Sequence, residues 1–300
     1  MHKSEPLPDV ACSMLRKHAF PLKWVGMEGL AVPLTLEMET NPRHFSIARA
    51  AIYVGLSDTS ARGIHMSRLH RILNQLDDAP CAKSTLDSLL DESVASQAGL
   101  SQSARIDLAF DLLLKRPALL SGEYGYQSYP VKIQAELVQS QRSYSIELTI
   151  PYSSTCPCSA SLSRQLLATA VDATFADQKL DKASLLTWLQ SEQGSVATPH
   201  AQRSYAYVKL ITADNPWPDL SALIVELETV IGTPVQTAVK RVDEQDFARL
   251  NAENLMFCED AARRIKGSLE RMDAVAEYWL KVEHQESLHA HNAVVVDQKH

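Results

Sequence analysis

The sequence has little cysteine and no long apolar run. Five cysteines in 300 residues are an odd number in a long chain, so we expect no disulfide framework and place the protein in the reducing cytoplasm. No run of about twenty apolar residues is present, which excludes a membrane-spanning helix and a membrane partner. The segment Met1–Val10 lacks the apolar stretch of a secretory signal, so we expect no export.

Positive charge is also scarce. The chain has 29 Lys and Arg against 36 Asp and Glu, a formal net charge of −7, and no basic stripe. Nucleic-acid-binding proteins usually carry a basic excess, so nucleic acid is not an expected partner. A local cluster of Arg and Lys can still bind phosphate on an acidic protein, which leaves anionic small molecules open as substrates.

What the chain does have is a doubled order of secondary structure. Its length suffices for two cores, and the apolar spacing predicts strand, strand, helix, helix, strand, strand in each half. The halves share this pattern without sequence identity. We therefore expect an irregular segment at 1–24, a first ββααββ unit at 25–139 and a second unit at 140–300. The predicted strands are Gly29–Leu36, Phe45–Val54, Ala104–Leu114, Tyr129–Val138, Ser143–Pro151, Ser204–Thr212, Ala274–His284 and His291–Val296, and the predicted helices are Met66–Leu76, Thr85–Ala98, Leu220–Ile231 and Glu253–Leu269.

One stretch of the second half does not fit the repeat. Residues 160–198 form an insertion with helical spacing at Ser161–Ala170 and Lys182–Gln190 and a loop at Gln193–Ser195. Long connections of this kind are usually functional lids or surface excursions.

The segment Thr155–Ser159, with the sequence Thr-Cys-Pro-Cys-Ser, follows a strand-like run and holds two of the cysteines. A Cys-Pro-Cys turn cannot close as a disulfide without severe strain, because the neighbouring side chains diverge. At least one sulfur is therefore free, and a free thiol at a strand end is a candidate metal ligand or nucleophile. The alternative is a buried core thiol, for which a proline between two cysteines is poor material.

Three further segments collect ligand-type side chains. They are His200–Ser204 at the entry to a strand, Lys240–Glu244 after a Thr-Pro break, and Glu286–Asn292 between the last two strands. One thiolate, one imidazole and one carboxylate with an open position make a catalytic metal site, and such a metal lowers the pKa of bound water from about 16 to near 7. Spacing alone leaves surface histidines and solvated helix-start acids as alternatives, since no compact zinc motif is present.

Two other features bear on chemistry. His289 and His291 are two residues apart, so in extended backbone both face the same side and can approach one site. Positive charge for a polyphosphate is available near the same segments. The residues concerned are Lys240, Arg241, Arg203 and Arg264.

Together these segments resemble the GTP cyclohydrolase family of type IB. Phe257–Asp260 (Phe-Cys-Glu-Asp) and Gly63–Arg68 (Gly-Ile-His-Met-Ser-Arg) add to the resemblance, which runs from about residue 25 to 297. It implies an α+β tunnelling fold (T-fold) of two ββααββ units with antiparallel sheets, assembling into a barrel as a homotetramer with active sites at subunit interfaces. It further implies hydrolysis of GTP at purine C8, formate release and rearrangement to 7,8-dihydroneopterin triphosphate, the pterin that opens tetrahydrofolate biosynthesis, with a divalent metal: zinc, manganese or iron.

The resemblance also assigns roles to residues. It implies metal binding by Cys156, His200, Glu244 and His289, with His289 acting as ligand or proton donor, and catalysis by Cys156, His200, His289 and His291. Glu259 would grip the purine edge, since a carboxylate can accept hydrogen bonds from guanine N1–H and the exocyclic amine. Lys240, Arg241, Arg203 and Arg264 would bind the triphosphate. The chain departs from many relatives in its long insertion and at Ala201 and Leu288, none of which is a ligand.

Two alternative functions stay open at this point. A deazaguanine nitrile reductase of the same fold would use a cysteine nucleophile and a nicotinamide cofactor without metal, but it carries a lysine-type signature where this chain has His289 and His291. A non-catalytic, zinc-stabilised purine-binding protein would ligate its metal fully, and chelation would unfold it.

Overall fold

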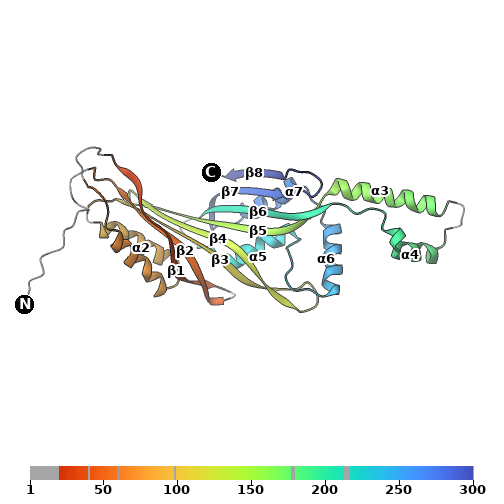
Figure 1. The fold of residues 1–300 in the computed structure, drawn as a ribbon, viewed down its shortest axis with the longest axis horizontal. Helices are drawn as coiled ribbons and strands as arrows, with labels where there is room; N and C mark the ends of the chain where they lie inside the picture. The colour runs from red at the N-terminus through yellow and green to blue at the C-terminus, as the bar shows by residue number, and fades with distance from the viewer. Residues whose placement is uncertain are drawn as a thin grey trace, which may run out of the picture.

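The described part of the chain forms one continuous sheet. The computed structural model describes residues 20–39, 41–59, 61–97, 99–176, 180–212 and 217–299, without the side chain of Pro42, so most of the predicted irregular segment and the predicted helix end at Ala98 lie outside it. Eight strands pair in sequence order, each antiparallel to the next (Figure 1). They are β1 (Leu22–Met38), β2 (Asn41–Leu56), β3 (Ser103–Pro117), β4 (Tyr124–Val138), β5 (Gln141–Thr155), β6 (Ala201–Thr212), β7 (Val275–His284) and β8 (Ala293–Lys299).

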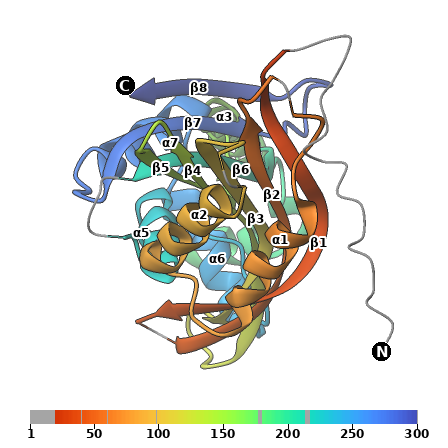
Figure 2. The same cartoon turned by 90° about the vertical axis from the view of Figure 1, so that its left-hand side faces the viewer.

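Helices cover one face of this sheet. Alternate strand residues point to that face and pack in a single apolar core with the buried sides of α1, α2, α5 and α7, and Figure 2 shows α1, α2 and α5 on the same side of the curved sheet. The described helices are α1 (Met66–Leu73), α2 (Lys83–Ser96), α3 (Pro157–Thr174), α4 (Lys182–Gln190), α5 (Leu220–Ile231), α6 (Arg241–Glu253) and α7 (Cys258–Leu269), with 3-10 turns η1 (Asn74–Asp77) and η2 (Glu192–Gly194).

The opposite face of the sheet is polar. It carries ion pairs such as Lys209 on β6 with Glu147 on β5 at 3.1 Å, and Lys281 with Glu283, two residues along β7, at 2.6 Å. An antiparallel sheet with one packed and one polar face reads as alternating apolar and polar residues, which is the pattern that predicted the strands.

The first half has the predicted order of strands and helices, and the two halves join directly. Val138 pairs with Gln141, so β4 and β5 form a two-residue hairpin whose turn residues Gln139 and Ser140 have φ of 50° and 68°. The sheet of the first half therefore continues without a break into that of the second.

One helix prediction is wrong. The sequence pattern predicts a single helix over Glu253–Leu269, but α6 ends at Glu253 and α7 begins at Cys258. The chain breaks there because the Met256 N–H donates to the Thr155 carbonyl at 3.2 Å and the Asp260 carboxylate caps α7. The second half thus has three helices between β6 and β7, where the pattern predicts two.

The predicted insertion forms a helical arm that projects from one end of the sheet (Figure 1). It leaves the sheet after Thr155 and returns at Ala201, which are register partners on β5 and β6. Ala160 is the buried residue of α3, and none is buried in α4. Among the described residues, no helix combines the length and apolar character needed to cross a membrane.

Candidate functional site

Cys156 and His200 meet at the base of the arm. The Cys156 N–H donates to the His200 carbonyl at 3.2 Å, continuing the β5–β6 pairing by one residue. Cys156 is the N-cap of α3, with Pro157 following it, and its Sγ accepts from the Ser159 N–H at 3.5 Å. The Ser159 hydroxyl in turn accepts from the His200 N–H at 3.1 Å. The Cys-Pro-Cys turn is therefore a helix start that fixes the thiol beside the histidine.

A hydrogen-bond chain orients the His200 ring. His200 Nδ1 lies 3.0 Å from Gln202 Oε1, Gln202 Nε2 donates to Ser154 Oγ at 2.7 Å, and Ser154 Oγ lies 2.8 Å from Ser204 Oγ. Because an amide oxygen only accepts, this network places the imidazole proton on Nδ1 and leaves the Nε2 lone pair available. Ser154 and Ser204 are buried. An imidazole held in this tautomer is suited to ligate a metal through Nε2.

Sequence reasoning missed these supporting residues as functional. Gln202 stands inside the predicted His200–Ser204 segment, but its contact with Ser154 depends on the β5–β6 register. Glu286 was also missed: its Oε2 lies 3.7 Å from His200 Nδ1, and its side chain is 13% exposed. The one available signal was its place at the start of the predicted Glu286–Asn292 segment.

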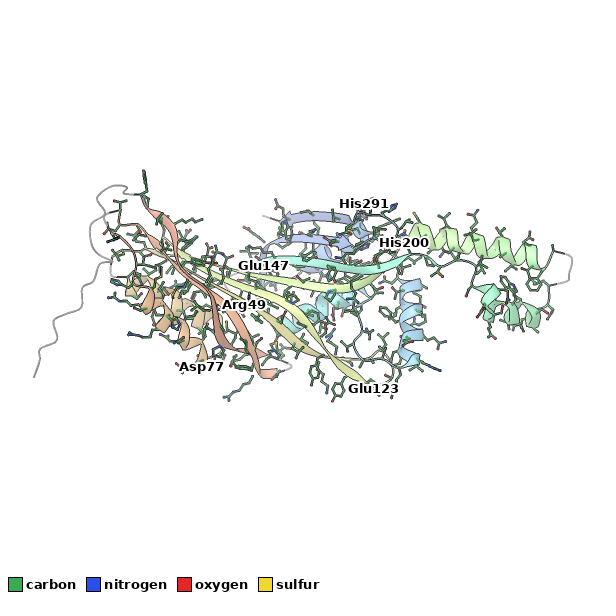
Figure 3. All side chains as sticks on the ribbon, in the orientation of Figure 1. Arg49, Asp77, Glu123, Glu147, His200 and His291 are labelled. Atoms are coloured by element: carbon green, nitrogen blue, oxygen red, sulfur yellow. The ribbon has the colours of Figure 1, made fainter. Side chains whose placement is uncertain are left out.

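His289 and His291 lie in the loop between β7 and β8. Their rings stack with centroids 5.0 Å apart and planes at 17°, and both side chains are exposed. Figure 3 places His291 and His200 at the same end of the sheet. The two rings lie together, although the backbone here is a loop and not the extended strand that the prediction assumed.

Glu244 lies elsewhere. Near the end of α6, Asn251 accepts a hydrogen bond from Ser153 Oγ at 2.7 Å, so this end of the helix lies close to β5. Glu244 comes two helical turns earlier in α6. At 1.5 Å per residue it is about 10 Å from Asn251 along the helix axis. The beginning of α6 is anchored to the β3–β4 hairpin, where Lys240 pairs with Glu123 at 2.6 Å; Figure 3 labels Glu123 well away from His200. Within the described ranges, no cluster of three or more His, Cys, Asp or Glu is placed to hold a metal ion.

The predicted substrate-binding residues are dispersed. Glu259 is exposed in the first turn of α7, and Arg203 and Arg241 are exposed. Arg264 is engaged: its guanidinium donates to the Ile231 carbonyl at 3.0 Å and to Asn254 Oδ1 at 2.6 Å, closing the end of α5. In this chain Arg264 therefore has a structural partner already.

Two buried titratable groups lie beneath Glu259. His284 Nε2 is 2.9 Å from the Tyr152 hydroxyl, and burial lowers the pKa of His284 to about 4, although the nearby Glu259 carboxylate opposes the shift. Burial also raises the pKa of the Cys258 thiol to about 11. Cys258 is therefore an inert core thiol, in contrast to the partly exposed Cys156.

The donor chemistry at the arm base fits a divalent metal. A thiol and an imidazole with a free Nε2 are ligands that zinc, manganese and iron accept to different degrees, and the carboxylate of Glu286 stands behind the imidazole. Within the described part of a single chain, Cys156 and His200 lie together, and no third predicted ligand joins them in a cluster.

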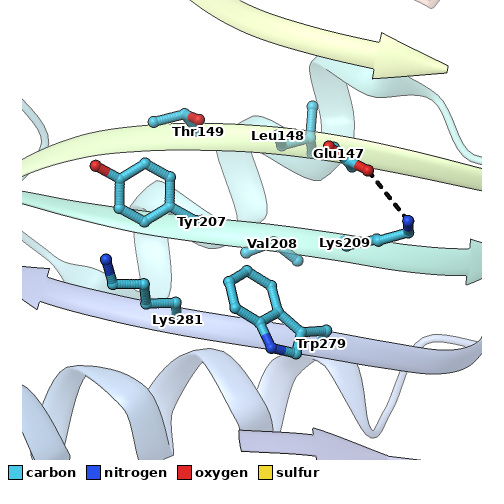
Figure 4. Close-up of a pocket in the computed structure, with 8 residues that line it drawn as sticks. All are labelled: Glu147, Leu148, Thr149, Tyr207, Val208, Lys209, Trp279 and Lys281. Atoms are coloured by element: carbon cyan, nitrogen blue, oxygen red, sulfur yellow. Dashed lines mark ion pairs between the residues drawn. The ribbon is translucent and has the colours of Figure 1, made fainter. Parts of the chain in front are cut away.

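A hollow on the polar face of the sheet is a poor candidate by comparison. It measures about 390 Å³ and lies over β5, β6 and β7 (Figure 4). Its cations are already neutralised, since Lys209 pairs with Glu147 and Lys281 with Glu283. No charge is left there to recruit a ligand.

Comparisons with known proteins bear on the family and fold of this chain. A family model described as type I GTP cyclohydrolase folE2 matches residues 7–295. The chain is similar to proteins named GTP cyclohydrolase FolE2 from Hahella chejuensis (54% identical, covering 98% of this chain and 96% of that protein) and from Hydrogenovibrio crunogenus (44% identical, covering 98% and 94%). Among solved structures, the uricase from Arthrobacter globiformis is similar over 95% of this chain and 94% of that chain, with a TM-score of 0.52 and 7% identity. That likeness to a T-fold protein concerns the fold alone.

Proposed function

Because the chain belongs to the type I GTP cyclohydrolase family, we propose that it hydrolyses GTP at C8 of the purine, releases formate and yields 7,8-dihydroneopterin triphosphate for tetrahydrofolate biosynthesis. The observation that supports this most is the backbone hydrogen bond that sets Cys156 beside His200, whose ring Nδ1 is held by Gln202. That geometry is suited to a metal-assisted hydrolysis. The nitrile reductase would also use a cysteine, but it carries a lysine-type signature where this chain has His289 and His291.

We assign Cys156 and His200 to hold a zinc, manganese or iron ion, completed by Glu244 and His289. When bound, the ion supplies a Lewis acid that activates water at neutral pH. Gln202 keeps the His200 Nε2 lone pair directed outward, and Ser159 fixes the backbone on which that ring stands. The Glu286 carboxylate, 3.7 Å from His200 Nδ1, helps to hold the ring in place.

The remaining roles follow from charge and exposure. Glu259 accepts hydrogen bonds from guanine N1–H and the amine, which orients C8. His289 and His291 are exposed at the same end, so one of them can protonate the ring nitrogen as the imidazole ring of the base opens. Arg203, Lys240 and Arg241 bind the triphosphate, with Arg264 contributing only if it releases its structural partners.

We propose that Glu244 reaches the site from a second copy of the chain. Helix α6 is tied at both ends, by Asp243 to the amides of Leu120 and Ser121 and by Asn251 to Ser153, so it is not free to swing toward Cys156 of its own chain. A homotetramer with sites at subunit interfaces satisfies this constraint. The four described cysteines are free thiols, which suits the reducing cytoplasm.

The test removes the thiol. Metal-stripped protein is incubated with GTP, single metals are added back, and formate and pterin fluorescence are measured. Cys156→Ala should lower turnover by about a thousandfold or more, as expected for loss of a metal-holding group. Cys158→Ala, which removes the exposed neighbouring thiol, is the matched control and should stay near wild type.

Full formate release by metal-loaded Cys156→Ala would overturn the assignment. NADPH consumption with a deazaguanine nitrile, in place of formate release, would point instead to the reductase.

A further inference from the structure

A cavity lies next to the candidate site, on the opposite face of strands β5 and β6. Ser154 and Gln202 face the site, whereas Ser153, Thr155 and Ala201 alternate with them and face the cavity. The cavity measures about 630 Å³ and is enclosed by the end of β5, the base of α3, the segment 194–199 and α6. Its volume falls in the range of small-molecule pockets, roughly 300–1,000 Å³.

The lining is apolar with a single charge. Leu167, Val196, Phe247 and Leu255 supply its apolar walls, and Arg164 is the one charged residue that lines it. Three of the polar residues inside the cavity satisfy one another: Asn251 accepts from Ser153 and Thr155, and its amide also donates to the Phe247 carbonyl. Over the described ranges, no ion pair or hydrogen bond is found for the Arg164 guanidinium, and no carboxylate lines the cavity.

We propose that this cavity binds a small organic anion with a flat apolar body. The body would lie against Phe247 and Leu167, and a carboxylate or sulfonate would pair with Arg164. A second copy of the chain is a weaker candidate occupant, because the exposed leucines of the arm, Leu162 and Leu166, lie outside the lining. The cavity and that apolar stripe are separate surfaces.

The position of the cavity gives such a ligand an effect on catalysis. Thr155 directly precedes Cys156, and Ala201 directly follows His200. A bound anion therefore contacts the two strand ends that set the distance between the thiol and the imidazole. The ligand would control, from the reverse face, the turnover assigned above under the proposed function.

The binding test uses 8-anilinonaphthalene-1-sulfonate, a flat apolar body with one sulfonate. Its fluorescence should rise saturably at one site per chain in the full-length protein. Arg164→Gln should weaken binding about tenfold, the loss expected for one charge-assisted hydrogen-bonded contact. The uncharged analogue N-phenyl-1-naphthylamine should bind the wild type and Arg164→Gln equally. Arg263→Gln, at an exposed arginine of α7, is the matched control and should bind both probes as wild type does.

Two variants fill the cavity. Ala248→Trp and Ala252→Trp replace small exposed residues of α6 that line it, so each places a ring inside without burying a new polar group. Both should abolish saturable binding, and with it any effect of the probe on formate release. Unchanged binding by the two folded variants would overturn the proposal. The proposal would also fail if the wild-type protein bound the probe only after dilution into single chains. That result would mean that a second copy of the chain fills the cavity in the assembled protein. Because fluorescence reports binding without turnover, failure of this site is distinguishable from failure of the proposed activity.

Discussion

At the scale of single residues, His284 is the clearest example of a side chain whose state is set by its surroundings. Tyr152, Ser204 and His284 are register partners across β5, β6 and β7, and all three are buried. The imidazole is hydrogen-bonded to the Tyr152 hydroxyl and kept neutral by burial, directly beneath the α7 turn that carries Glu259. It therefore ties the end of the sheet together where the site is built.

This predicts a loss of stability in mild acid. The pKa of His284 falls from 6.5 to about 4 on folding, so between these values the unfolded chain binds a proton that the folded chain does not. Stability consequently rises with pH across this window and is lost as pH falls through it, by about 2 kcal/mol between pH 7 and pH 5. Urea unfolding at both pH values measures it. His284→Gln, which keeps a hydrogen-bonding group but does not titrate, should flatten the dependence, and an unchanged slope in that variant would refute this account.

The residue types in the sequence predicted the candidate metal ligands but not the side chains that hold those ligands in place. Cys156 and His200 stand out in the sequence because their chemistry is scarce, and a backbone hydrogen bond sets them side by side. Gln202, Ser154 and Glu286 do not stand out, because glutamine, serine and glutamate are common on any surface. Their roles come from a strand register that places side chains from distant segments 2.7 to 3.7 Å apart, and composition carries no signal for that.

At the scale of elements, apolar alternation predicted most of the sheet, and its failures have local causes. β1 begins at Leu22, ahead of the predicted Gly29, because an irregularity between Met27 and Leu30, with Gly29 at φ 73°, interrupts the alternation. Helix α6 was missed because it has almost no apolar stripe: its buried residue is Asp243, and it is held by polar contacts.

Those polar contacts can be tested at Asp243. Its carboxylate accepts from the amides of Leu120, Ser121 and Lys240, and hydrogen bonding, led by Ser121, holds its pKa well below the ordinary 3.8. A carboxylate whose pKa is lowered on folding stabilises the fold above pH 3.8. That stabilisation is lost as the pH falls further and the folded-state carboxylate takes up a proton. Asp243→Asn should raise amide hydrogen exchange at Leu120 and Ser121 about tenfold or more at neutral pH, by loosening α6 from the hairpin. Glu244→Gln, one residue along and exposed, is the control; equal protection in both variants would show that the cap does not anchor the helix.

At the scale of the whole molecule, the main consequence is that one chain holds an incomplete set of the predicted ligands. Cys156 and His200 stand at the arm base, and Glu244 stands at the anchored end of α6. If sites form between copies, two inactive variants should complement each other. Mixing Cys156→Ala and Glu244→Ala chains, after dissociation and reassembly, should restore about a quarter of wild-type formate release, since random pairing gives that share of intact sites. No recovery from reassembled mixtures would mean that both ligands belong to one chain.

The pairing of Thr155 with Ala201 has a consequence for how this chain tolerates change. The arm starts and ends at neighbouring positions on β5 and β6, so its two ends are close together whatever its length. The entropic cost of closing a loop grows only slowly as the loop becomes longer. Residues of the outer arm, between Ala168 and Gln193, are thus free to be shortened, lengthened or exchanged while Cys156, His200 and the cavity lining keep their places. In evolutionary terms, the outer arm is where this protein can acquire new partners without risking its chemistry.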